Sequence, residues 1–329
     1  MNYKHLIALT TDHGVFEHCA GRNPRLEHGY CVDDVARALM VAERGLSDDH
    51  GLEQVAEMSS RFLSNALNDE GLMCNRRDVS GEWRGPFATG DHWGRSLWAW
   101  GTTMAESGDP ARRAAAERGW DRAARQRSPF LRSMAHAVLG AGEVLRVAPR
   151  DPLALALLCD FSAMVSPSGH PAWPWPEARL TYANAIVPHA LLISGCHLGD
   201  DELVDRSLRM LTWLVQVQSR GEHLSLIPNT GWSPGQILPD FDQQGIEVAH
   251  LIEAMVFAEE IAPQPMWKDV LASGVGWFLG DNDTGIAMAD PRDGAGFDGL
   301  TWTGRNPNAG AESTLSYLSV MQRARQYLS

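Results

Sequence analysis

Residues 91–127 read DHWGRSLWAWGTTMAESGDPARRAAAERGWDRAARQR and divide into two halves of helical length. Aromatic and apolar residues dominate the first half, 91–106, whereas the second half, 110–127, is charged along one side. Helical periodicity predicts a helix in each half, and the turn at 107–109 is short enough to make the two helices antiparallel neighbours. The aromatic helix suits an inner position and the charged helix an outer one.

The same pairing recurs along the whole chain. Periodicity and helix-ending residues predict twelve helices in six pairs, at residues 3–10, 33–45, 51–67, 91–106, 110–127, 131–147, 151–165, 182–197, 200–218, 243–262, 265–279 and 310–326. No alternating strand pattern competes with them. We therefore predict an all-α fold, an (α/α)6 toroid of six helical hairpins formed by residues 1–329 as one domain. Residues 3–10 are expected beside 310–326, where they close the ring.

Long loops follow the second helix of several pairs, and each contains Gly, Pro and Trp. They span residues 68–90, 166–181, 219–242 and 280–309. If the short turns lie at one end of the ring, these loops meet at the other end, around the N-termini of the inner helices. The sequence thus predicts a polar, Trp-rich cleft at that end.

Charge and hydropathy exclude several classes of function. The chain has 28 Lys and Arg against 41 Asp and Glu, a net charge of −13, and no basic stripe that could neutralise phosphates. Nucleic acid and anionic membranes are therefore not expected as partners. The first residues lack the apolar core of a signal peptide, and no uninterrupted apolar run approaches about 18 residues. We expect a cytoplasmic protein.

Two adjacent carboxylates, Asp33 and Asp34, begin the inner helix expected at 33–45. Their pKa values can be pushed apart, because the second charge costs more energy beside the first. One carboxyl could then act as an acid and the other as a base or as a ligand for a sugar hydroxyl. Helix capping is the alternative role, since Asp is a preferred N-cap residue.

Three further inner helices begin with polar or aromatic side chains that could contact a sugar. These residues are Asp91, Trp93, Arg95, Asp242, Gln243 and Glu312. Carboxylates, amides and guanidinium groups in such positions suit sugar hydroxyls, which need donors and acceptors with fixed orientation. Capping and pairing within one helix explain some of them equally well.

Aromatic placement also indicates carbohydrate. Six of the 12 Trp fall in the long loops or at an inner-helix start: Trp83, Trp93, Trp173, Trp175, Trp232 and Trp302. An exposed indole face can stack against a pyranose ring. Trp173 and Trp175, in a Pro-rich loop, form the densest pair. The structural alternative is that their two indoles plug the ring.

Several strings of the chain resemble those of a known group of proteins. They are GYCxDDxARAL (29–39), DxxGRxLW (91–98), FDQQ (241–244), FDGL (297–300) and GAESTL (310–315). In their residues and in their order along the chain, these strings are similar to those of bacterial six-hairpin glycosidase-like proteins. Members of that group occur alone or attached to glycosyltransferase-like domains. The resemblance implies a toroid and a carbohydrate context, and it adds Tyr30 and Asp298 to the candidate substrate-binding residues. Val35 and Gly245 depart from the group, which more often has Asn and Pro there.

These observations together predict a glycoside hydrolase that cleaves an oligosaccharide or glycoside with two carboxyl groups. The resemblance implies inversion by a directly activated water. The Asp33/Asp34 pair is expected in one role and Glu312 or Asp242 in the other. The expected substrate-binding residues are Asp91, Arg95, Trp93, Trp173, Trp175, Gln243, Asp298 and Tyr30. We expect no metal and no cofactor, and the sequence indicates no oligomeric state.

Two other functions fit the same sequence. A sugar epimerase or isomerase would use histidine as acid and base, and His136, His189 and His250 lie within inner helices. A non-catalytic glycan-binding domain would bind sugar without turnover. A zinc site at Cys196-His197 is not favoured, because this pair lies at the C-terminal end of its helix and lacks a ligand motif.

Overall fold

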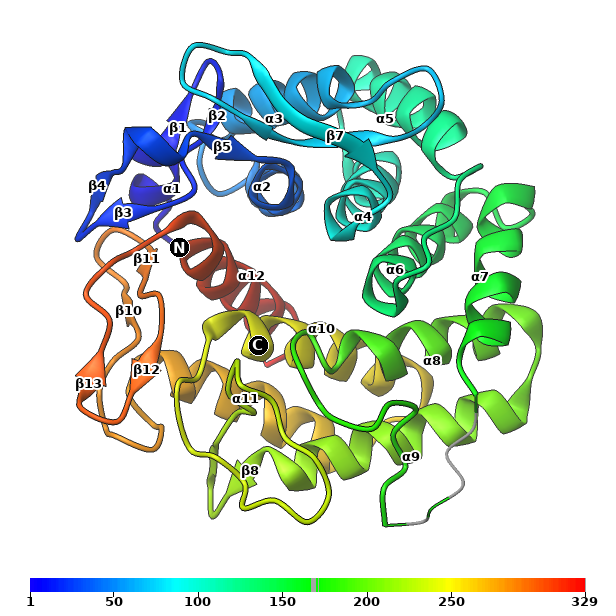
Figure 1. Cartoon of the computed structure of the whole chain (residues 1–329), viewed down its shortest axis with the longest axis vertical. Helices are drawn as coiled ribbons and strands as arrows, with labels where there is room; N and C mark the ends of the chain where they lie inside the picture. Colours follow the sequence, from blue (N-terminus) through cyan, green and yellow to red (C-terminus); the bar gives the residue numbers. More distant parts are fainter. Residues whose placement is uncertain (167–169, 171, 329) are drawn as a thin grey trace.

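The computed structural model describes residues 1–166, 170 and 172–328, and its helices form a closed ring (Figure 1). The helices are α1 (Lys4–Leu9), α2 (Val32–Gly45), α3 (Leu52–Ala66), α4 (Asp91–Glu106), α5 (Pro110–Ala123), α6 (Leu131–Val147), α7 (Pro152–Met164), α8 (Ile186–Leu198), α9 (Asp201–Val217), α10 (Gly245–Ile261), α11 (Pro265–Leu279) and α12 (Ala311–Tyr327), with a 3-10 helix η1 at Leu26–His28. The even-numbered helices make the inner layer, and the others surround them. The predicted (α/α)6 toroid is confirmed.

Most predicted helix boundaries agree with the structure within a few residues. The clearest shift is at α8, which was predicted from residue 182 but begins at Ile186. Ala183 has a φ of 48°, which breaks the helical path. The Asn184 side chain also accepts a hydrogen bond from the Thr181 amide at 3.0 Å, so it shapes a turn before the helix.

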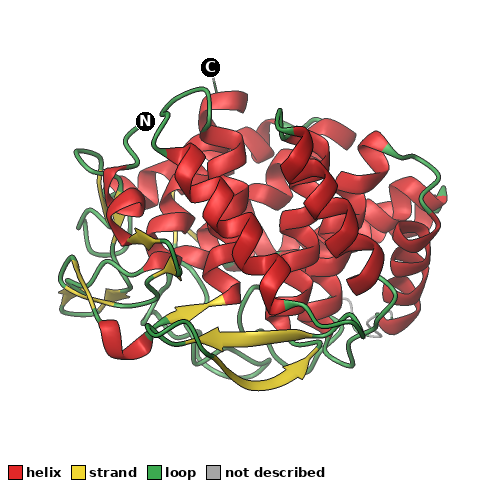
Figure 2. Ribbon diagram, turned by 90° about the horizontal axis from the view of Figure 1, so that it is seen from above, coloured by secondary structure: helices red, strands yellow, loops and turns green. Residues whose placement is uncertain are grey.

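Short antiparallel strands occur in the long loops and between α1 and α2, where the sequence predicted none. They are β1 (Thr10–Thr11), β2 (Gly14–Val15), β3 (Cys19–Ala20), β4 (Asn23–Pro24), β5 (Tyr30–Cys31), β6 (Met73–Arg77), β7 (Trp83–Ala88), β8 (Ser219–Arg220), β9 (His223–Leu224), β10 (Ala289–Asp290), β11 (Ala295–Gly296), β12 (Leu300–Thr301) and β13 (Gly304–Arg305). Only β5, β6 and β7 form a three-stranded sheet among the described residues; the others pair in twos. Most have two residues, too few for an alternating pattern. Figure 2 shows the β6 and β7 hairpin crossing one end of the helices.

Glycine allows α4 and α6 to pack backbone against backbone. A Cβ added to Gly101 would lie 2.4 Å from the Gly140 carbonyl oxygen, and one added to Gly94 would lie 2.1 Å from that of Ser133. Real Cβ atoms do not approach an oxygen so closely. This contact therefore depends on residues without side chains.

Aspartate side chains cap three outer helices but none of the inner helices that carry the predicted site. Asp109 accepts from the Ala111 amide at 2.8 Å, Asp151 from Ala154 at 2.7 Å, and Asp200 from Leu203 at 2.9 Å. The N-cap residues of α2, α4, α10 and α12 make no side-chain capping bond, and the first amide of α2, that of Val32, donates to the Asn75 side chain at 3.1 Å. The capping alternative is therefore wrong for the inner-helix carboxylates.

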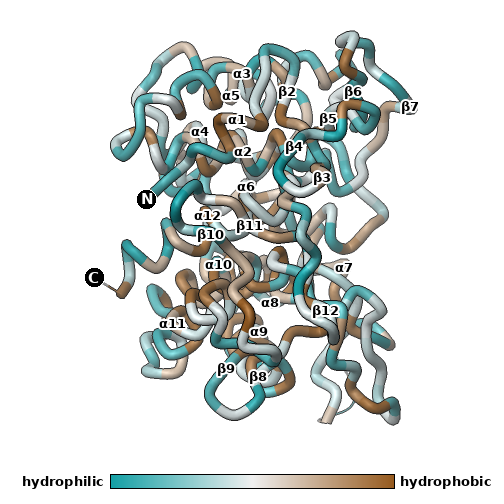
Figure 3. Tube along the Cα trace, turned by 90° about the vertical axis from the view of Figure 1, so that its left-hand side faces the viewer, coloured by the Kyte–Doolittle hydropathy of each residue, from teal (hydrophilic) through white to brown (hydrophobic). Residues whose placement is uncertain are grey.

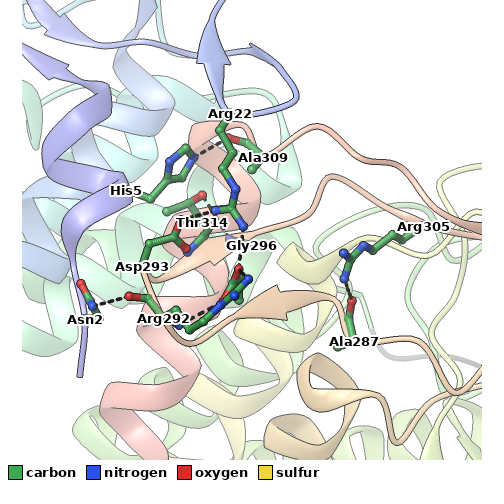
Figure 4. A network of polar contacts seen from close by, with 12 residues as sticks. Asn2, His5, Arg22, Ala287, Arg292, Asp293, Gly296, Arg305, Ala309 and Thr314 are labelled. Carbon is green, nitrogen blue, oxygen red and sulfur yellow. Dashed lines mark hydrogen bonds and ion pairs between the residues drawn. The ribbon is translucent and has the colours of Figure 1, made fainter.

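Hydrogen bonds between the first and last parts of the chain close the ring (Figure 4). His5 lies in α1, and its Nε2 is 2.9 Å from the Ala309 carbonyl oxygen, just before α12. The Asn2 side chain donates to the Arg292 carbonyl at 2.6 Å, and Arg22 pairs with Asp290 at 2.8 Å. The Gln322 side chain of α12 also donates to the Tyr3 hydroxyl at 3.2 Å, which confirms the predicted closure of residues 3–10 against 310–326.

The apolar core follows the helices around the ring. In Figure 3 the tube is largely brown along α8 and α10 and teal at the turn between β8 and β9. Six tryptophans are among the largest fully buried side chains: Trp93, Trp100, Trp120, Trp175, Trp267 and Trp277. No helix of the described chain combines the length and apolarity needed to cross a membrane.

Candidate active site

A polar pocket of about 260 Å³, here called the mouth pocket, opens among the N-terminal ends of α2, α4 and α12. Its lining residues are Glu17, His18, Cys31, Asp33, Asp34, Arg37, Arg95, Gln244, Asp298, Gly310, Glu312 and Ser313. Five of the residues predicted for the site are therefore brought together here. The predicted cleft at this end of the ring is polar as expected, but it is not Trp-rich, because none of these lining residues is a tryptophan.

Asp33 is held as an anion between two donors. Its Oδ1 accepts from the Arg95 guanidinium, and its Oδ2 accepts from the Asn75 amide at 3.1 Å. Burial alone would raise the pKa of this carboxyl, but the charges of Arg95 and Arg37 outweigh burial, so the pKa lies below its ordinary value. Asp33 is thus ionised at neutral pH.

Asp34 occupies a different environment, although it is the next residue. Its side chain is 4% exposed; Oδ1 accepts from Arg37 at 2.6 Å, and Oδ2 accepts from the Cys31 thiol at 3.2 Å. Burial raises the pKa of Asp34 to about 7; Arg37 opposes this rise, and the negative charges of Glu312 and Glu17 add to it. A large fraction of Asp34 therefore carries a proton near neutral pH.

Arg37 links Asp34 to a third carboxyl group. One guanidinium nitrogen donates to Asp34, and another donates to Glu312 Oε2 at 3.0 Å. The Glu312 side chain is 43% exposed, so water in the mouth pocket can reach it. A protonated carboxyl and an accessible carboxylate thus share one pocket. General acid and base catalysis requires these two groups.

Seven of the twelve lining residues were not predicted for the site: Glu17, His18, Cys31, Arg37, Gln244, Gly310 and Ser313. Glu17 and His18 come from the loop between β2 and β3, Cys31 ends β5, and Gln244 lies directly before α10. The stretch that contains Glu17 and His18 has no helical periodicity that would place it at the mouth. Only the closure of the ring brings this stretch beside α2 and α12.

Gln243 was predicted to bind substrate, but its neighbour Gln244 lines the pocket. The Gln243 side chain is fully buried; it donates to Asp283 Oδ2 at 2.6 Å and accepts from the Trp277 indole at 3.0 Å. It therefore anchors the start of α10. Asp242 is exposed and does not line the mouth pocket, so the structure does not bring it to Asp34.

Three predicted aromatic contacts are buried instead of presented to the pocket. Trp93 is 0% exposed and donates its indole N–H to the Ala123 carbonyl at 3.2 Å. Trp175 is 2% exposed, as is Tyr30, which packs against Phe16. These rings offer no free face to a sugar, which corrects their assignment as substrate-binding residues. For Trp175 this burial agrees with the structural alternative, in which the loop indoles plug the ring.

The other predicted binding residues differ in their position relative to the mouth pocket. Asp298 lines the pocket and accepts from the Gly310 amide at 2.8 Å, and burial raises the pKa of its carboxyl. Asp91 lies outside the pocket lining; it accepts from Ser133 Oγ at 2.7 Å and from the Tyr182 hydroxyl at 2.8 Å. Trp173 is partly buried and contacts other tryptophans away from the pocket.

The histidines of the epimerase alternative lie deeper in the ring. His136 and His250 are 5.5 Å apart, measured between ring centroids, and both rings lie near Trp98. Burial holds the pKa of each well below its ordinary value, so both rings are neutral. The cavity that His250 lines has a volume of only about 30 Å³, which admits a water molecule or two and no sugar.

Glu17, Cys31 and Asp34 place ligand-type atoms within 4.8 Å of one another, the only such group of three or more among the described residues. Burial raises the pKa of the Cys31 thiol well above its ordinary value, so the thiol stays protonated. Arg76 pairs with Glu17, and Arg37 pairs with Asp34. Both carboxylates of this group therefore already have guanidinium partners.

No family model matches the sequence, and no curated protein matches it. Solved structures do match over nearly the whole chain. A cellobiose 2-epimerase from Bacillus thermoamylovorans covers 97% of this chain and 95% of its own, with 9% identity and a TM-score of 0.71. A sugar epimerase from a ruminal bacterium gives the same coverage, with 13% identity and a TM-score of 0.69.

A solved hydrolase has the same fold. An inactive variant of an α-1,6-mannanase from Salegentibacter sp., in complex with α-1,6-mannotriose, covers 97% of this chain and 96% of its own, with 12% identity and a TM-score of 0.60. That variant carries asparagine in place of two consecutive aspartates. At these identities the likeness establishes the six-hairpin toroid, and function has to be argued from the site.

Proposed function

We propose that this chain hydrolyses a glycosidic bond in the mouth pocket, with Asp34 as general acid and Glu312 as the base that activates water. One observation carries the proposal: Asp33 and Asp34 are adjacent, yet their surroundings push their pKa values in opposite directions. Such divergence is typical of carboxyl groups with separate catalytic roles.

The roles follow from the contacts. Asp34 can give its proton to the leaving glycosidic oxygen, and Arg37 then stabilises the carboxylate that remains. Glu312 can take a proton from water, because its side chain is partly exposed in the pocket. Asp33, fixed by Arg95 and Asn75, supplies a permanent negative charge that would stabilise the positively charged, oxocarbenium-like transition state.

The mannanase of the same fold lends support. Its inactive variant lacks two consecutive aspartates, and this chain has one consecutive pair in its mouth pocket, Asp33 and Asp34. The inner-helix position of this pair and the lack of any capping bond argue for chemistry at these residues. We infer a neutral oligosaccharide as substrate, because both pocket arginines are already paired with carboxylates.

Proton NMR of the protein with manno-, gluco- and galacto-oligosaccharides tests the proposal. A new reducing-end signal with the purified protein, absent with Asp34→Asn, is the expected result. The anomer that forms first reports the stereochemistry, and inversion is expected from a base that activates water directly. Bound sugar that stays intact in every reaction would contradict hydrolysis and indicate a binding domain.

Epimerisation is the second candidate, since solved epimerases and a D-mannose isomerase share the fold. The neutral, adjacent rings of His136 and His250 are the observation in its favour. The 30 Å³ cavity beside them is the observation against it, because the sugar would have to reach these rings. In the same NMR experiment, a sugar with changed configuration and unchanged chain length would establish the epimerase.

A further inference from the structure

A second cavity lies at the opposite end of the ring from the mouth pocket. This far cavity has a volume of about 170 Å³, and its lining includes Trp98, Glu106, Glu143, His189, Glu253 and Phe257. Most of these residues come from the middle and C-terminal parts of α4, α6, α8, α10 and α12, whereas His189 lies near the start of α8. None of them lines the mouth pocket, so the two sites are distinct.

The electrostatics of the far cavity favour a cation. Four of its lining residues are glutamates and two are arginines. Both arginines already pair with lining glutamates, Arg146 with Glu143 at 2.6 Å and Arg323 with Glu253 at 2.9 Å. Arg44 also pairs with Glu253, at 2.6 Å, so four carboxylates face three guanidinium groups and a net negative charge remains. Five inner helices also end here, and the carbonyl end of a helix carries partial negative charge.

The walls of the far cavity suit an organic cation. Trp98, Phe257 and Tyr327 contribute aromatic rings, which attract ammonium groups through their faces and also cover apolar carbon. Among the described residues, the only cluster of metal-type ligands lies in the mouth pocket, so the far cavity is not arranged for a metal ion. An apolar cavity of about 150 Å³ holds a molecule the size of benzene, which sets the scale for the ligand.

A buried histidine gives an independent indication of a ligand. His189 lines the far cavity and is 5% exposed, and its Nδ1 has no hydrogen-bond partner in the described part of the chain. Burial lowers the pKa of His189 to about 4, although the charge of Glu253 opposes this shift. The ring is therefore neutral, and one of its nitrogens can accept a hydrogen bond from an ammonium group. An unpaired buried polar atom is costly unless something binds it.

We propose that the far cavity is a second binding site, which takes a small organic cation: a primary amine on an apolar body of about six or seven carbon atoms. The ammonium group lies between the glutamates and His189, and the apolar body lies against Trp98 and Phe257. This site does not depend on the reaction in the mouth pocket.

Calorimetric titration with three ligands of one shape tests this site: cyclohexylamine, cyclohexanol and cyclohexanecarboxylate. Near neutral pH, cyclohexylamine should bind saturably with one site per chain. Cyclohexanol should bind about tenfold more weakly, because it lacks the charge, and the carboxylate should not bind. No saturable binding of the amine, or equal binding of amine and alcohol, would overturn the proposal.

Two variants locate the bound amine. Replacing Glu106 and Glu143 by Gln removes two negative charges from the far cavity and should weaken cyclohexylamine binding about tenfold. Asp34→Asn, in the mouth pocket, should leave that affinity unchanged. The opposite pattern would place the amine in the mouth pocket and refute the far site. Because these titrations measure binding alone, their result is independent of whether the chain hydrolyses sugars.

Discussion

Asp33 and Asp34 are consecutive residues of one helical turn, but each pairs with a different arginine, Asp33 with Arg95 of α4 and Asp34 with Arg37 of its own helix. The two carboxyls are therefore stabilised in different protonation states. Asp33 keeps its charge, whereas Asp34 is buried deeply enough to retain a proton near neutral pH. An acid and an anion thus occupy adjacent positions of the chain.

Replacing Asp34 with Asn should reduce kcat about a hundredfold to ten-thousandfold, the usual contribution of a general acid. The melting temperature should change little, because an amide has the shape of a protonated carboxyl and its oxygen can still accept from Arg37. Initial rates and thermal unfolding of the two proteins check this. Full activity combined with a large loss of stability would assign Asp34 a purely structural role.

The rate of hydrolysis should fall as the pH rises through about 7, because Asp34 must be protonated to act as an acid. The same group affects stability. Its pKa is raised in the folded state, so the native protein binds more protons than the unfolded chain between the ordinary carboxyl range and about 7. The contribution of Asp34 to stability is therefore lost as the pH rises across that window. A pH profile of kcat/KM that rises through 7 would instead make Asp34 a base.

Replacing Gly101 with Ala should destabilise the fold by about 1–3 kcal/mol, the usual cost of overpacking. The new methyl group would meet the Gly140 carbonyl oxygen at 2.4 Å and force α4 and α6 apart. Gly108→Ala is the matched control, since a Cβ there has no atom within 4 Å. Urea unfolding of both variants measures the difference, and equal stability would show that the two helices separate freely.

Removing the Glu253 carboxylate should cost about 3–5 kcal/mol, because Arg44 and Arg323 would be left as buried, unpaired charges. All three side chains are largely buried, with exposed fractions of 5%, 6% and 12% for Glu253, Arg44 and Arg323. Glu82→Gln is the control; Glu82 pairs with Arg84 on the surface, where such a pair contributes less than about 1 kcal/mol. Denaturant unfolding of Glu253→Ala and Glu82→Gln measures the free energy of unfolding that each substitution removes.

Changing His136 and His250 to Gln separates hydrolysis from epimerisation. Neither residue lines the mouth pocket, so hydrolysis should continue at a rate within a few-fold of the parent protein. If the histidines carry out proton transfer on a sugar, turnover should instead fall by about a hundredfold or more. Product analysis of the double variant, with circular dichroism as a check on folding, distinguishes the two results.

The sequence determined the helical pairs, the ring and the location of the mouth. Hydrophobic periodicity is local, so the inner and outer character of 91–106 and 110–127 can be seen without a structure. The strings around Asp33, Asp34, Arg95 and Glu312 also marked the correct helix starts. All four residues line one pocket because every inner helix of a toroid begins at the same end.

Only the tertiary structure decided which side chains face the pocket. Gln243 and Gln244 differ by one position, and their roles depend on how Trp277 and Asp283 pack against the start of α10. Trp93 and Trp175 are of the residue type that stacks against sugars, but both are buried in the structure. Burial, charge pairing and cavity shape arise from contacts between residues far apart in the chain, and a local pattern does not contain them. The same is true of the far cavity, because its walls come from five helices that meet only when the ring closes.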